Sequence, residues 1–129
     1  MLFSPVRGVV VRGTIPVAGA VVTRTYHGAF TNKKGIESTV TDVNGVFHFD
    51  AIRAHGLLAS IVPHQPIIDQ AIHIAHANQT FEAWFYIKKN YNEQGEVGRP
   101  IVMRCNLETE PRVVRIDDLR QYFGLCDLQ

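Results

Sequence analysis

A turn signal followed at once by a strand signal lies in the first half of the chain. Asp42-Val43-Asn44-Gly45 combines side chains that bond to nearby backbone with a glycine that accepts a positive φ. The next four residues, Val46-Phe47-His48-Phe49, alternate, which places Phe47 and Phe49 on one face of an extended strand. Because aromatic residues at period two between turn residues are typical of antiparallel strands, this feature predicts a β-sheet protein with both phenylalanines in its core.

Similar segments recur along the chain. Gly13–Pro16 separates two valine-rich runs and predicts a tight turn between antiparallel strands, and Ala77-Asn78 predicts a second hairpin. The expected strands are Val9–Val11, Val17–Val22, Thr39–Thr41, Val46–Phe49, Leu57–Val62, Gln70–His76, Phe81–Ile87 and Ile101–Leu107. About seven or eight short strands with turn signals at short intervals predict an all-β, antiparallel β-sandwich.

The C-terminal region has a different pattern. Asp117–Gly124 starts with two acids and ends at glycine, which predicts one or two turns of helix. The adjacent aspartates are expected to complement the helix dipole rather than to act as catalytic carboxylates.

Length and charge limit the function classes. The 129 residues are expected to form a single domain, 1–129, with 46% hydrophobic and 19% charged residues. A net charge of +1 gives no global field for nucleic acid, and no apolar stretch is long enough for a membrane span. The start of the chain lacks a cationic leader with an apolar run, so the expected location is cytoplasmic, or periplasmic if a leader has been trimmed.

The positive charges are concentrated near the N-terminus. Arg7, Arg12, Arg24, Lys33 and Lys34 all precede the first acid of the chain. They are expected to be solvated outward positions of strands and a loop, or one basic face that meets an acidic partner.

Cys105 and Cys126 leave two alternatives open. They could form a disulfide that joins the C-terminal segment to the last strand, or they could be two reduced thiols. Their spacing does not suit a zinc site.

Two motifs together resemble a known family. They are Gly8-Val9-Val10-Val11-Arg12-Gly13-Thr14-Ile15-Pro16-Val17-Ala18-Gly19-Ala20-Val21-Val22 and Thr41-Asp42-Val43-Asn44-Gly45-Val46-Phe47-His48-Phe49. This pair resembles the carboxypeptidase regulatory-like domains, which implies a transthyretin-like β-sandwich. The rest of the chain resembles a small bacterial subfamily in Leu2-Phe3-Ser4, the Lys33-Lys34-Gly35 loop, the Trp84 strand, and the loop with Asn90-Tyr91-Asn92-Glu93 and Gly95-Glu96. This resemblance implies an accessory of a secretion system such as type VI, or an immunity protein that binds a toxin or effector. Fold by itself does not determine function.

No catalytic motif is recognisable in the sequence. The hydroxyisourate hydrolases of this fold end in Tyr-Arg-Gly-Ser, whereas this chain ends in Leu125–Gln129. A nucleophile elbow, a phosphate-binding glycine loop and a zinc-protease helix are also missing. We therefore expect no enzyme activity and no cofactor. The least favoured alternative is a small hydrolase or metalloenzyme with a metal site from His27, His55 and His64.

Binding residues are expected in two places. The loop after the Phe81–Ile87 strand mixes charge with an aromatic ring, which suits a protein contact through Lys88, Lys89, Tyr91 and Glu93. Trp84, Phe85 and Tyr86 are consecutive, so at least one ring should face away from the core. Either Trp84 and Tyr86 are core and the tail covers Phe85, or an aromatic anchor lies on an exposed sheet face.

These features favour a non-catalytic module that binds a protein, with an oligomeric state that the sequence leaves open. The alternative is a carbohydrate- or cell-wall-binding β-sandwich in which Trp84, Tyr86 or Tyr91 stacks on sugar.

Overall fold

The computed structural model describes residues 2–28, 34–53, 67–88 and 96–129. These residues contain eleven strands and no helix. The strands are β1 (Val6–Arg12), β2 (Ile15–Pro16), β3 (Val21–Gly28), β4 (Lys34–Val40), β5 (Val46–Phe49), β6 (Ile68–His76), β7 (Gln79–Lys88), β8 (Ile101–Asn106), β9 (Arg112–Arg115), β10 (Gln121–Gly124) and β11 (Cys126–Leu128). In this part of the chain, no helix that could cross a membrane is present. The expected strand Leu57–Val62 lies outside the described residues.

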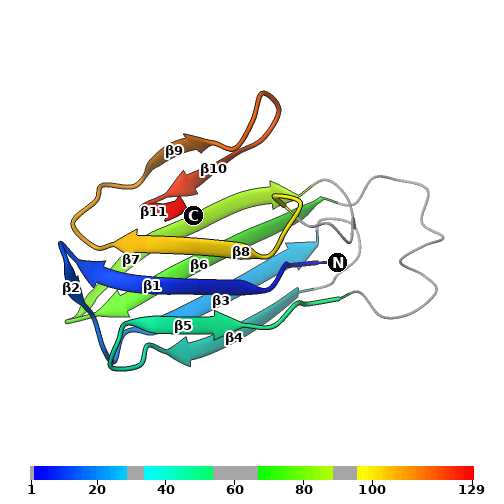
Figure 1. Ribbon diagram of the computed structural model, residues 1–129. Coiled ribbons are helices and arrows are strands. Elements are labelled where there is room, and N and C mark those ends of the chain that lie inside the picture. The colour runs from blue at the N-terminus through cyan, green and yellow to red at the C-terminus, as the bar shows by residue number, and fades with distance from the viewer. Residues whose placement is uncertain (1, 29–33, 54–66, 89–95) are drawn as a thin grey trace.

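The strands form two sheets in a sandwich-like arrangement (Figure 1). The six-stranded sheet has the order β4-β3-β6-β7-β10-β9 and is antiparallel throughout. The five-stranded sheet has the order β11-β8-β1-β2, with β5 also paired to β1. The second valine run is in β3 and so belongs to the six-stranded sheet, whereas β1 makes its tight turn with the two residues of β2.

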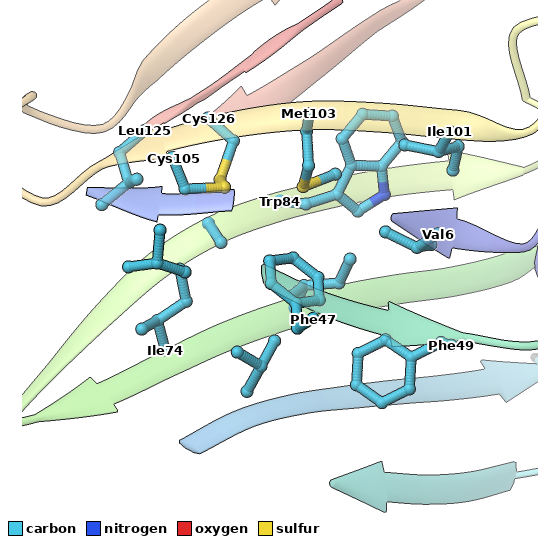
Figure 2. Close-up of a cluster of buried hydrophobic side chains, with 14 of the residues drawn as sticks. Val6, Phe47, Phe49, Ile74, Trp84, Ile101, Met103, Cys105, Leu125 and Cys126 are labelled. Carbon is cyan, nitrogen blue, oxygen red and sulfur yellow. A yellow bond between two sulfur atoms is a disulfide. The ribbon is translucent and has the colours of Figure 1, made fainter. Parts of the chain in front are cut away.

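Apolar side chains from both sheets fill the space between them (Figure 2). Phe47 and Phe49 of β5 are buried and contact each other edge to face, as the alternating pattern predicts. Trp84 of β7 stacks on Tyr122 of β10, with ring centroids 4.5 Å apart. The prediction of an all-β protein with both phenylalanines in the core is confirmed.

The predicted turns at Asp42–Gly45 and at Ala77-Asn78 are present. Asp42 accepts hydrogen bonds from the backbone N–H groups of Asn44 and Val46, and Gly45 has a φ of 76°. Ala77 and Asn78 have φ values of 53° and 63° and connect β6 to β7. Two consecutive residues at positive φ match the right-handed twist of the strands that they join.

The predicted helical turn at Asp117–Gly124 is wrong. Its second half, Gln121–Gly124, is β10, which pairs antiparallel with β9. Asp117 does cap backbone N–H groups, those of Leu119 and Arg120, but it does so in the loop of a β-hairpin. An aspartate can satisfy these donors in a turn as well as at a helix start, so the acid signal did not distinguish the two.

The expectation of purely antiparallel sheets is also wrong, because β1 and β8 pair in parallel from Val6 opposite Ile101 to Val11 opposite Asn106. The described strands outnumber the seven or eight expected, because strands as short as β2 and β11 contain too few residues to show an alternating pattern.

The two cysteines form a disulfide. Cys105 on β8 and Cys126 on β11 are directly opposite in the register, and both are buried. Figure 2 shows this bond beside Leu125 in the core. Of the two alternatives that the sequence left open, the structure therefore contains the covalent one.

Candidate functional site

The three consecutive aromatic residues of β7 point in two directions. Trp84 and Tyr86 are buried in the core, where their ring centroids are 5.7 Å apart. Phe85 points to the opposite face, and 43% of it is exposed. The C-terminal segment pairs with β7 beside Phe85 but does not cover it. The exposed aromatic group is therefore Phe85.

Phe85 belongs to an apolar row that crosses the whole six-stranded sheet. The register sets Val113, Phe123, Phe85, Ala71, Thr25 and Ile36 side by side on β9, β10, β7, β6, β3 and β4. With strands about 4.8 Å apart, the row is roughly 24 Å long.

We define the apolar patch as Phe85, Ile87, Val113, Leu119 and Phe123, all of which are exposed. These five side chains line one groove of about 660 Å³ over β7, β10 and β9. Contiguous exposed apolar surface of this kind marks interaction sites in soluble proteins, whereas isolated exposed apolar residues do not.

The β9–β10 hairpin builds one side of the groove. Its loop is closed by Asp117, whose carboxylate accepts from the Leu119 and Arg120 N–H groups and from the Arg120 guanidinium. The hydrogen bond from Arg120 lowers the pKa of Asp117, and the same bond raises the pKa of Arg120. These hydrogen bonds hold the loop that carries Leu119, which lines the groove.

A close backbone approach fixes β10 against β7. A Cβ at Gly124 would lie 2.0 Å from the carbonyl oxygen of Ala83, so this position needs glycine. Next to it, the Tyr122 hydroxyl donates to the Cys126 carbonyl at 2.7 Å, and burial raises the pKa of Tyr122. These contacts place Phe123 opposite Phe85.

The surroundings of the patch are charged. Arg120 borders the groove, and Arg115 and Asp118 lie on the same hairpin with most of their side chains in solvent. An apolar centre inside a charged, solvated rim is the usual composition of a protein–protein contact surface.

A second group of polar side chains is buried where β6 begins and β7 ends. Gln70 donates to Glu96 Oε1 at 2.6 Å and to the Leu2 carbonyl at 2.9 Å. Lys88 is buried beside them, and this burial lowers its pKa, although Glu96 opposes the shift. The group joins the N-terminal segment to the six-stranded sheet, and its burial favours a structural role.

Arg24 is buried at the other side of the core. Its guanidinium lies between the Phe3 and Phe49 rings, 4.7 Å and 4.6 Å from their centroids. It donates to the carbonyl oxygens of Ser4 and Asp50. The expectation that Arg24 is solvated is therefore wrong, because the side chain is fully buried between two core rings.

Among the residues expected to bind, those within the described ranges are buried. Trp84, Tyr86 and Lys88 are buried, and Lys89, Tyr91 and Glu93 lie outside the described residues. The buried residues fail as a surface because inward positions alternate along β7, from Trp84 to Tyr86 to Lys88.

The histidines proposed for a metal site are only partly described. His27 is exposed on β3, whereas His55 and His64 lie outside the described residues. Within the described ranges, no group of three or more histidine, cysteine or acidic side chains could hold a metal ion.

Sequence reasoning missed Arg24, Gln70, Glu96 and Phe123. A signal existed for two of them: Arg24 follows Val22 at period two, and Gln70 lies between Ile68 and Ile72 at the same period. Phe123 lies in the segment whose acids and glycine predict a helix, and that pattern gives no signal for an outward strand position.

A family model described as "Domain of unknown function (DUF6795)" matches residues 6–110, which is most of the chain. The chain belongs to the DUF6795 family. The match begins with β1 and ends before β9, so the β9–β10 side of the groove and Cys126 lie outside the matched span. No curated protein and no solved structure matches the chain.

Proposed function

We propose that this DUF6795 member is a non-catalytic module that binds a protein partner through the apolar patch. The observation that carries the proposal is the pair Phe85 and Phe123, which lie directly opposite on adjacent strands with 43% and 37% exposed. Aromatic side chains supply much of the binding energy at protein interfaces, since they remove a large apolar area from water.

The shape of the site supports a protein partner. The groove is formed by the outer face of a sheet and one hairpin, and it is lined mostly by apolar side chains. Its exposed rings are phenylalanines, and the tryptophan and tyrosine suggested for stacking on sugar, Trp84 and Tyr86, are buried. Burial of these two rings argues against carbohydrate binding through them. Tyr91, the third ring suggested for stacking on sugar, lies outside the described residues.

The identity of the partner stays a prediction. The resemblance of the rest of the chain to a small bacterial subfamily suggests a toxin or effector of a bacterial secretion system. The apolar patch fits such a partner if its contacting surface is apolar with acidic groups that meet Arg115 and Arg120.

The test compares three variants as immobilised baits against lysate of the native host. Phe85→Ser and Phe123→Ser remove the rings, and Ile15→Ser removes an equally apolar side chain, 70% exposed, from the other sheet. We expect one protein to be captured by the wild type and by Ile15→Ser, and to bind each phenylalanine variant at least about tenfold more weakly when purified. Equal binding to all four chains, or no capture by the wild type at physiological salt, would contradict the proposal.

A further inference from the structure

The strand β4 is an open edge of the six-stranded sheet. Within the described ranges, β3 is the only strand that pairs with it, from Val21 opposite Val40 to His27 opposite Lys34. This ladder has no register shift, and β4 contains no proline. An edge strand of this length without a bulge or proline is a template for pairing with another strand.

The direction of the backbone groups of β4 follows from its end. Thr41 donates its N–H to the Ala20 carbonyl, and its own carbonyl accepts from Gly19, so both groups face β3. Because the direction alternates along an antiparallel ladder, the N–H and C=O groups of Lys34, Ile36, Ser38 and Val40 point away from β3.

The side chains of these four residues lie on the outer face. Ile36 is 71% exposed and Val40 is also exposed, whereas Glu37 points to the opposite face and binds the buried Arg24. The outward edge therefore presents two apolar residues, one serine and one lysine.

We propose that β4 pairs antiparallel with β4 of a second copy of this chain, about a two-fold axis at Ser38. In this register Ser38 faces its own copy, and each Ile36 faces Val40 of the other copy. In each of these pairs, both residues direct their N–H and C=O groups towards the other chain. Each pair can therefore exchange two backbone hydrogen bonds.

Charge favours this register over the neighbouring one at Glu37. Lys34 falls near Asp42 of the second copy, which lies in the turn just after β4, and both side chains are exposed. A two-fold axis at Glu37 would instead set two like carboxylates opposite each other and would pair Lys34 with Val40. Cross-strand pairs of opposite charge and of apolar residues are favourable, whereas like charges are not.

The resulting dimer has one continuous sheet, and it keeps the two apolar patches exposed. Phe85 and Phe123 lie on β7 and β10, at the far side of the sheet from β4. Self-pairing is therefore independent of the proposed protein partner, and the dimer would present that partner with two equivalent sites.

Cysteine cross-linking tests the register. Opposite residues of a hydrogen-bonded antiparallel pair have Cα atoms about 5.5 Å apart, which suits a disulfide. We expect Ser38→Cys to give a covalent dimer under mild oxidation. Val40→Cys alone should give no covalent dimer, because Val40 faces Ile36 of the second copy. An equimolar mixture of Ile36→Cys and Val40→Cys chains should give the mixed dimer. If Ser38→Cys cross-links no faster than Val40→Cys, the register is wrong.

Sedimentation equilibrium tests the dimer itself. Ser38→Pro removes an N–H that only the second copy uses, so the monomer should keep its fold while the dimer is lost. Asp42→Asn retains the turn acceptor but removes the charge, and we expect it to raise the dimer dissociation constant about tenfold. A wild-type chain that is monomeric at every concentration would overturn the proposal, even if Ser38→Pro does not fold.

Discussion

The guanidinium of Arg24 is completely buried, whereas its ion-pair partner Glu37, 2.5 Å away, has 44% of its side chain exposed. Burial lowers the pKa of Arg24, and the hydrogen bond with Glu37 opposes that shift. The two residues of this pair should therefore contribute unequally to the free energy of unfolding. Solvent can replace Arg24 as a partner of Glu37, but the hydrogen bond from Arg24 to the Ser4 carbonyl is buried.

Replacing the two members of this pair should have unequal effects. We expect Arg24→Met to lower the free energy of unfolding by about 3 kcal/mol, because it leaves the buried Ser4 carbonyl without its donor. Glu37→Gln should cost less, since the amide oxygen can still accept from Arg24 and that end is partly solvated. Urea unfolding of both variants measures the difference. Equal losses would show that the carboxylate, rather than the core carbonyls, is the important partner.

The pH dependence of stability should reveal Lys88. Its pKa is lowered in the folded chain by burial, so the unfolded chain holds this proton at pH values where the folded chain has released it. The free energy of unfolding should therefore rise as the pH increases from below towards about 10, the ordinary pKa of lysine. Burial raises the pKa of Tyr86 and of Tyr122, which acts in the opposite sense at still higher pH.

Two variants isolate that contribution. In Lys88→Met the rise should disappear, whereas Glu96→Gln removes the charge that supports the ammonium and should make the rise begin at lower pH. Chemical denaturation at several pH values gives the slope for each chain. The same slope in wild type and Lys88→Met would rule out Lys88 as its source.

Glycine is required where β10 meets β7. We expect Gly124→Ala to lower the free energy of unfolding by several kcal/mol, about as much as an overpacked core, because its Cβ would overlap the backbone of Ala83. Gly19→Ala is the matched control: its φ is 76° but no atom lies within 4 Å of the new Cβ, so it should cost only about 1 kcal/mol. Thermal unfolding compares the two. A loss at Gly124 no larger than at Gly19 would mean that β10 shifts at little cost.

The disulfide should contribute through the loop that it closes. Cys105 and Cys126 are separated by 21 positions, for which loop closure predicts about 3 kcal/mol of stabilisation. The double variant Cys105→Ala/Cys126→Ala should lose about this amount in urea unfolding. A thiol assay on the denatured wild type checks that the bond is present. Unchanged stability would indicate that β11 is held by its other contacts alone.

Local features of the fold were predictable. The Asp42–Gly45 turn, the positive-φ pair Ala77 and Asn78, and the inward direction of Phe47 and Phe49 each depend on a few consecutive residues. Within so short a segment, turn chemistry and period two act on the same strand, so the sequence determines the outcome.

Whether a residue on a strand lies in the core or on the surface depends on which other segments of the chain pack beside that strand. Arg24 is buried because Phe3, Ser4 and Phe49, distant in the chain, supply its partners. The apolar patch exists because β10 joins the sheet beside β7 and brings Phe123 to Phe85. The amino-acid sequence by itself thus determined the strands, their turns and part of the core. Tertiary structure alone decided the parallel β1–β8 pairing, the buried charges and the binding face, because each depends on a free-energy difference between alternative long-range pairings rather than on local conformation.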